Sequence, residues 1–129
     1  MTIHGTVSRL REARVAVTVR GAVGRADQTL DALIDTGYED YLTLPTNIVA
    51  MLDLPFARDQ EIQVVGGGLV TLPVYYAVII FGGKEMAGEV MAADNPPLIG
   101  MALLDGYDLH IEVVAGGNVS LTPMPLTPA

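Results

Sequence analysis

Apolar and polar residues alternate along several stretches of the chain, and this period of two is typical of β-strands with one buried face. The alternating apolar positions are Val15, Val17 and Val19; Val70, Leu72, Val74, Tyr76, Val78 and Ile80; Ile111 and Val113; and Val119 and Leu121. Each of these stretches is predicted to be a strand.

Glycine-bearing segments separate the alternating stretches, at residues 21–24, 66–68, 82–83 and 116–118. Turns of this kind join antiparallel strands into hairpins, so the sequence predicts an all-β meander. Closure of such a sheet into a barrel would remove exposed strand edges. Edges left open at the termini could instead pair with a second copy of the chain.

Two short helices are predicted between the strands. Thr46 can cap a helix over Asn47–Leu52, with Pro55 beyond its end. A second helix is predicted over Met101–Asp105, stopped by Gly106. The tail, residues 123–129, contains three prolines and is expected to be loosely ordered.

The length of 129 residues fits a single domain with a sizeable core, so one domain is predicted over residues 1–129. The longest apolar run, Val74–Phe81, has eight residues, far short of the ~20 that a membrane helix needs. The N-terminus has no signal-peptide pattern, and a cytoplasmic location is expected. The absence of cysteine excludes disulfides and thiolate metal sites.

The formal net charge of −8 disfavours nucleic acid and anionic membranes as partners, because both need clustered Lys and Arg. The seven basic residues are scattered along the chain. A solubility role explains the acidic balance, and a preference for basic substrates is the alternative. His4 and His110 lack neighbours at ligand spacing, so neither a metal nor another cofactor is predicted.

The sequence Asp35-Thr36-Gly37 directly follows the apolar pair Leu33-Ile34. A carboxylate buried without partners costs several kcal/mol or takes up a proton. Gly37 permits a tight turn that a Cβ atom would hinder. Asp35 is therefore either a hydrogen-bonded structural acid or a residue used in chemistry.

Two further segments can accompany the acid. Leu98-Ile99-Gly100 lies before the second predicted helix, and an apolar pair followed by glycine can pack behind an acid-bearing loop. Gly66-Gly67-Gly68 lies between predicted strands Glu61–Val65 and Leu69–Phe81. No Lys-Ser/Thr follows these glycines, so they form a hairpin tip and not a phosphate-binding loop.

From about Val15 to Leu121, the order of acid loop, glycine hairpin, apolar-glycine segment, helix and closing strand resembles the retropepsin-like aspartic proteases. It looks closest to a small prokaryotic branch with Tyr or Phe after the Asp-Thr-Gly. The resemblance implies a closed β-barrel with one short C-terminal helix, in a two-fold homodimer.

The resemblance also implies roles for individual residues. Asp35 would be catalytic and Thr36 and Gly37 would support its loop, while Leu98, Ile99 and Gly100 would pack behind it. Tyr38, Glu39, Asp40 and the flap glycines Gly66, Gly67 and Gly68 would contact substrate. Tyr38 stands where viral and pepsin-like members usually carry Ala or Ser, so it adds bulk beside the cleft.

The chemistry of this family needs two carboxylates that share one proton and activate a water between them. The chain has one Asp-Thr-Gly, so the second acid would be Asp35 of an identical chain. This predicts an aspartic endopeptidase that hydrolyses an extended peptide or protein substrate.

Two alternatives stay open. One is a catalytically weak or inactive dimeric peptide-binding module with the same fold, which the bulk of Tyr38 favours. The other is a small β-barrel that binds an apolar ligand, which leaves the paired motifs unexplained.

Overall fold

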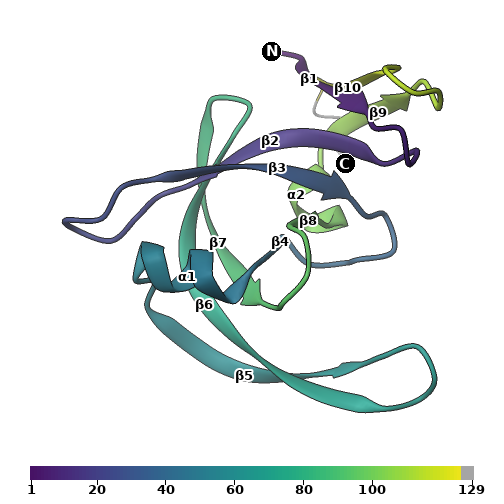
Figure 1. Ribbon diagram of the computed structural model, residues 1–129. Helices are drawn as coiled ribbons and strands as arrows, with labels where there is room; N and C mark the ends of the chain where they lie inside the picture. The colour runs from purple at the N-terminus through teal and green to yellow at the C-terminus, as the bar shows by residue number, and fades with distance from the viewer. Residues whose placement is uncertain (126–129) are drawn as a thin grey trace.

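The computed structural model describes residues 1–125, and most of its regular structure is β-strand (Figure 1). The strands are β1 (Ile3–Val7), β2 (Ala13–Val19), β3 (Gln28–Ile34), β4 (Leu42–Leu44), β5 (Phe56–Gln63), β6 (Leu69–Phe81), β7 (Lys84–Ala92), β8 (Leu98–Ile99), β9 (Tyr107–Ile111) and β10 (Asn118–Pro123). The helices are α1 (Thr46–Leu52) and α2 (Met101–Leu104). The predicted dominance of strands, with few and short helices, is confirmed.

All ten strands belong to one sheet, in the order β5-β6-β7-β4-β8-β3-β2-β1-β10-β9. Strand β6 also pairs with β2, through Thr18 opposite Ile80 and Val19 opposite Ile79. Strands β2, β3, β8, β4, β7 and β6 therefore follow one another in a ring. The closing contact is only these two residue pairs long, and a fully closed barrel stays a prediction.

The core lies inside this ring and is built from the alternating strands. Val15, Val17 and Val19 of β2 are all buried, as period two requires. The strand β6 was predicted correctly, but the residues on its buried face were not all predicted. Ile79 and Phe81 are buried, whereas Tyr76, one of the alternating positions, is exposed. Strand β6 pairs with β5 from Leu69 to Tyr75 and with β2 only at Ile79 and Ile80, so its surroundings change along its length.

Helix α1 corrects the prediction that Thr46 is a capping residue. The cap is Pro45, whose carbonyl accepts hydrogen bonds from the amides of Ile48 (3.0 Å) and Val49 (3.2 Å). Thr46 is the first helical residue, and its hydroxyl donates to Asp94 Oδ1 at 2.9 Å. The second helix, α2, ends one residue before the predicted Asp105.

The two terminal strands both lie inside the sheet. Strand β1 pairs with β10 and β2, and β10 pairs with β1 and β9. Within the described chain the outer edges of the sheet are therefore β5 and β9, not the termini. The alternation that suggested a strand as far as Val113 ends at Ile111, where the chain turns back toward β10.

The prediction of a loose tail is wrong at its beginning. Pro123 is the last residue of β10, and the amide of Met124 donates to the Gly106 carbonyl at 2.8 Å. Residues 126–129 lie outside the described part of the chain. No helix within residues 1–125 is long and apolar enough to cross a membrane.

Candidate active site

Asp35 is the first residue after β3, at the point where that strand runs parallel to β8. The pairs Leu33–Leu98 and Ile34–Ile99 align the two strands, and the Asp35 amide donates to the Ile99 carbonyl at 2.9 Å. The fold thus places the two motifs side by side, although they are distant in sequence.

Asp35 also closes its own turn. Its Oδ1 accepts a hydrogen bond from the Gly37 amide at 3.0 Å, and its carbonyl accepts one from the Tyr38 amide at 3.1 Å. Asp35 is half-buried, whereas Thr36 and Gly37 are exposed. The residues that precede Asp35 are only partly buried. Ala32 is buried, but Leu33 and Ile34 are half-buried and line an open hollow.

The start of α2 holds the acid loop through main-chain hydrogen bonds. The first amides of a helix have no partner within it and must find acceptors elsewhere. Here the loop supplies them: Gly100 N donates to Tyr41 O (3.0 Å), Met101 N to Tyr38 O (2.7 Å), and Ala102 N to Glu39 O (3.1 Å) and Asp40 O (3.2 Å). The loop that carries Asp35 is therefore fixed to the segment that follows Ile99.

Gly100 is in direct contact with the loop. A Cβ atom at this position would lie 2.1 Å from the Asp40 carbonyl oxygen and 2.7 Å from Tyr38 Cδ2. Only glycine allows this approach of the two main chains. The structure thus places Leu98 and Ile99 beside β3 and Gly100 against the loop.

Tyr38 packs away from the hollow beside Asp35. Its neighbours are Asp40, Gln60, Val74, Glu89 and Met91, which enclose only about 10 Å³ of free space. The pKa of the Tyr38 phenol is raised to about 12, mainly by burial and to a smaller extent by the charge of Asp40.

A buried hydroxyl lies close to this phenol. The side chain of Thr43 lowers the pKa of Tyr38 to a lesser extent than burial raises it. Thr43 Oγ1 has no hydrogen-bond partner of ordinary geometry within residues 1–125. The phenol therefore lies in a packed environment of polar and apolar side chains under the base of the β5–β6 hairpin.

The hollow beside Asp35 has a volume of about 430 Å³ and mostly apolar walls. It is lined by Arg11, Glu12, Ala13, Leu33, Ile34, Asp35, Thr36, Leu98, Ile111 and Val113. Concave apolar surfaces with few polar groups are typical of binding sites for ligands. The carboxylate is thus accessible from a space that an apolar side chain can enter.

Sequence reasoning missed the contribution of Arg11 and Glu12 to this hollow. They lie in a turn in which the Ser8 hydroxyl accepts hydrogen bonds from the amides of Leu10 and Glu12, both at 3.2 Å. Arg11 adopts a left-handed conformation with φ of 62°. A serine followed by a short charged segment between two strands was the available signal for such a turn.

The hairpin of β5 and β6 carries the predicted flap glycines at its tip. Gly66 and Gly67 have φ of 101° and 88°, a conformation that residues with a side chain rarely adopt. The tip is closed by hydrogen bonds from Val64 N to Gly68 O (2.9 Å) and from Gly67 N to Val64 O (3.1 Å). The hairpin extends away from the ring in Figure 1, and its glycines do not line the hollow beside Asp35.

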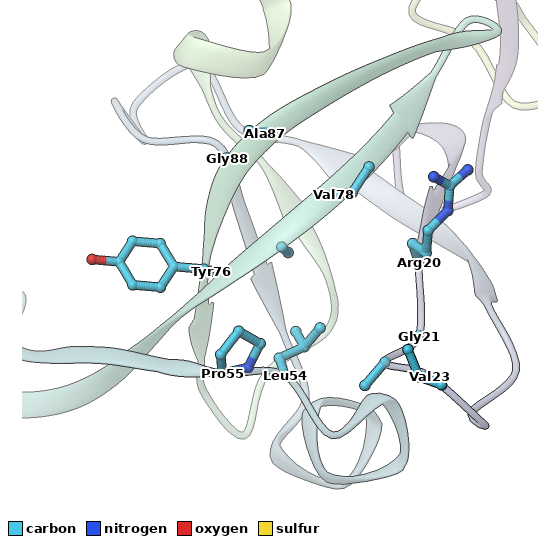
Figure 2. A pocket seen from close by; sticks show the side chains of 11 residues that line it. Arg20, Gly21, Val23, Leu54, Pro55, Tyr76, Val78, Ala87 and Gly88 are labelled. Atoms are coloured by element: carbon cyan, nitrogen blue, oxygen red, sulfur yellow. The ribbon is translucent and has the colours of Figure 1, made fainter.

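A second open hollow, of about 420 Å³, lies between the turn after β2, the segment after α1 and the middle of β6 and β7 (Figure 2). Tyr76 and Arg20 lie on either side of it, and none of its lining residues is acidic. It contains none of the predicted site residues. Residues 1–125 also contain no group of three or more His, Asp or Glu side chains placed to hold a metal ion.

The solved structures that share this fold include three proteases. The EIAV protease, complexed with an inhibitor, is 24% identical over 72% of this chain and 85% of that one, with a TM-score of 0.56. The Simian Foamy Virus (mac) protease is 18% identical over 70% and 90%, with a TM-score of 0.53. A retropepsin-like aspartic protease from Rickettsia conorii is 15% identical over 94% and 89%, with a TM-score of 0.62.

These similarities show that the chain has a retropepsin-like fold. No protein-family model matches the sequence, and no match was found among curated proteins. At such identities the likeness extends to the fold, and the activity has to be argued from the site itself.

Proposed function

We propose that this chain is an aspartic endopeptidase that acts as a homodimer, with Asp35 of each copy supplying one carboxylate. The observation that carries the proposal is the anchoring of the acid loop between β3, β8 and α2. This anchoring occurs on a retropepsin-like fold with one Asp-Thr-Gly per chain. A site with one acid is incomplete until a second copy joins it.

In the proposed site the two carboxylates lie about 3 Å apart and share one proton, because two like charges at that distance do not both ionise. The ionised carboxylate takes a proton from the water between them. The protonated carboxylate donates to the carbonyl oxygen of the peptide bond as the water attacks. Thr36 would hold the two loops together across the axis, and Gly37 would leave room for the substrate main chain.

The substrate in this proposal is an extended peptide with an apolar side chain next to the cleaved bond. Leu33 and Leu98 line the hollow that adjoins Asp35. Glu39 and Asp40 are exposed, and their carboxylates are available to substrate amides because only their carbonyls bind α2. The hairpin with Gly66–Gly68 at its tip would close over the bound peptide.

The deciding experiment replaces Asp35 with Asn. Cleavage of peptides by Asp35→Asn should fall by about 10²–10⁴-fold or more, since the variant has neither proton acceptor nor donor of the required kind. Its melting temperature and oligomeric mass should match those of the wild type. Asp31→Asn is a matched control on the same strand and should retain cleavage, since Asp31 is exposed.

Undiminished cleavage by Asp35→Asn would reject the proposal. A protein that binds peptides without cutting them, with a modest change of affinity in Asp35→Asn, would instead indicate the peptide-binding module. Tyr38 gives that alternative little support, because its ring packs outside the hollow beside Asp35.

A further inference from the structure

Strand β9 has a free outer edge within the described chain. Hydrogen bonds flank its pairing with β10, from Glu112 N to Asn118 O (2.9 Å) and from Met124 N to Gly106 O (2.8 Å). They show which residues of β9 direct their main-chain groups toward β10 and which direct them away from it. In an antiparallel ladder, successive residues direct their main-chain groups to opposite sides. The amides and carbonyls of Tyr107, Leu109 and Ile111 therefore face outward, ready to pair with another strand.

The side chains of β9 are self-complementary about Leu109. On one face Asp108 and His110 lie together, with His110 Nε2 3.3 Å from Asp108 Oδ1. Antiparallel pairing of two copies centred on Leu109 places Asp108 of each copy opposite His110 of the other. The same register places Tyr107 opposite Ile111, which continues the apolar face.

Main-chain alternation favours this register. With Leu109 in a hydrogen-bonded pair, Asp108 and His110 occupy non-hydrogen-bonded pairs, in which Cα atoms lie about 4.5 Å apart and side chains are closest. An imidazole opposite a carboxylate at such a position can donate a hydrogen bond to it, whereas two like charges placed opposite one another destabilise a sheet. A centre on Asp108 or on His110 would instead place identical side chains opposite one another.

The surroundings of the edge also suit a second copy. Met101, Ile111 and Met124 are 48%, 37% and 51% exposed, which leaves an apolar surface around β9. Tyr107 and Leu109 line a hollow with Thr36, and Ile111 lines the hollow that contains Asp35. A two-fold axis beside Leu109 therefore passes close to the acid loop.

We propose that β9 of one copy pairs antiparallel with β9 of a second copy, in the register centred on Leu109. This strand pair joins the two sheets and brings together the acid loops of the two chains. The inference rests on the proposed function for the identity of the partner, a second copy of this chain. It adds the strand, the register and the Asp108–His110 pairing that select that partner.

The test is a charge exchange on β9, read out as the dimer dissociation constant from sedimentation equilibrium. His110→Asp sets Asp108 against a second carboxylate at two symmetric positions and should raise this constant about tenfold or more. Asp108→Lys combined with His110→Asp removes the like-charge pair and places opposite charges across the interface, so it should return the constant close to the wild-type value. Asp35-dependent cleavage at low concentration should follow the same order.

His4→Asp is the matched control. His4 on β1 and His110 on β9 both lie opposite Ser120 of β10, so the two histidines share one face of the sheet. His4 is on an interior strand and away from the free edge, so His4→Asp should leave the dissociation constant unchanged. Circular dichroism and melting temperature show whether each variant is folded.

Any of three results would overturn the proposal. The wild type could be a monomer, His4→Asp could raise the dissociation constant as much as His110→Asp, or the double variant could fail to recover the wild-type constant. Failure of the proposed function would look different. Dimerisation would then follow the charge exchange while no Asp35-dependent cleavage occurred at concentrations where the dimer predominates. The opposite result is also possible to recognise. If Asp35→Asn abolished cleavage but no β9 variant changed the dimer dissociation constant, the proposed function would stand and the proposed β9 register would be rejected.

Discussion

Gly100 is the residue at which the acid loop and the start of α2 come into contact. Its missing side chain lets the loop carbonyls reach the helix amides, and its own amide donates to Tyr41 O. The position of Asp35 therefore depends on a glycine 65 positions further along the chain (100 minus 35). A substitution at Gly100 should therefore disturb the acid loop more than a substitution of an exposed side chain in that loop.

Gly100→Ala should destabilise the fold by about 1–3 kcal/mol, because the added methyl group overlaps main-chain atoms that cannot rotate away. Chemical denaturation measures this loss. Gly68→Ala is the control, since its methyl group would make only an ordinary contact, 3.4 Å from Val64. A Gly100→Ala variant as stable as the wild type would contradict the described packing.

At the residue scale, the sequence was informative where a residue has one physical role. Asp35 and Gly100 could be identified because an acid after an apolar pair and a glycine after another have few explanations. Thr46 could not be assigned correctly, because either its side chain or the Pro45 carbonyl can satisfy the first helical amides. The left-handed conformation of Arg11 has no sequence signal, since arginine rarely adopts it.

At the element scale, an ion pair joins β5 to β7 across β6. Arg58 donates to both carboxylate oxygens of Glu89, at 2.6 Å and 2.9 Å. The hydrogen bond from Arg58 is the main reason that the pKa of Glu89 is lowered. The pair stands at the base of the hairpin whose tip carries Gly66–Gly68, so it restrains that hairpin where it leaves the ring.

Glu89→Gln should reduce thermal stability slightly at pH 7, since the pair is partly exposed. A carboxylate with a lowered pKa contributes above the ordinary value of about 4.3 and loses its contribution as the pH falls through the lowered value. The difference in melting temperature between variant and wild type should therefore shrink below about pH 4.3. Glu61→Gln, on the exposed part of β5, is the control.

Strands β2, β6 and β10 could be predicted from period two and glycine turns, whereas β1 and β7 were not predicted. The core face of β6 could not, because an almost wholly apolar strand gives no contrast between its two faces. Val74 is buried beside Tyr38, whereas Ile79 is buried in the ring. Which face is covered depends on partners that are distant in sequence.

At the scale of the whole molecule, Asp35 and the free edge of β9 lie close together. The proposed enzyme should therefore lose specific activity on dilution. Below the dimer dissociation constant, the initial rate should rise with the square of chain concentration, because two chains make one site. Initial rates over a dilution series, compared with sedimentation data, measure this dependence. Constant specific activity across the range where the chain is monomeric would contradict it.

The order of strands could not be foreseen at this scale. The termini looked like open edges from their position in the sequence, yet β1 and β10 each have partners on both sides. The parallel contact of β3 with β8 likewise depends on register between distant segments. The resemblance to retropepsin-like proteases supplied the fold that local patterns could not specify.

The acid loop is attached to α2 through main-chain atoms, so its attachment does not depend on the side chains of the residues involved. Glu39 and Asp40 bind α2 with their carbonyl oxygens, so their side chains take no part in the attachment. Replacing either side chain leaves every loop-to-helix hydrogen bond possible, and in the proposed enzyme it would change the charge and shape offered to a bound peptide. If the chain acts as proposed, substitutions at residues 39 and 40 would alter specificity without displacing Asp35.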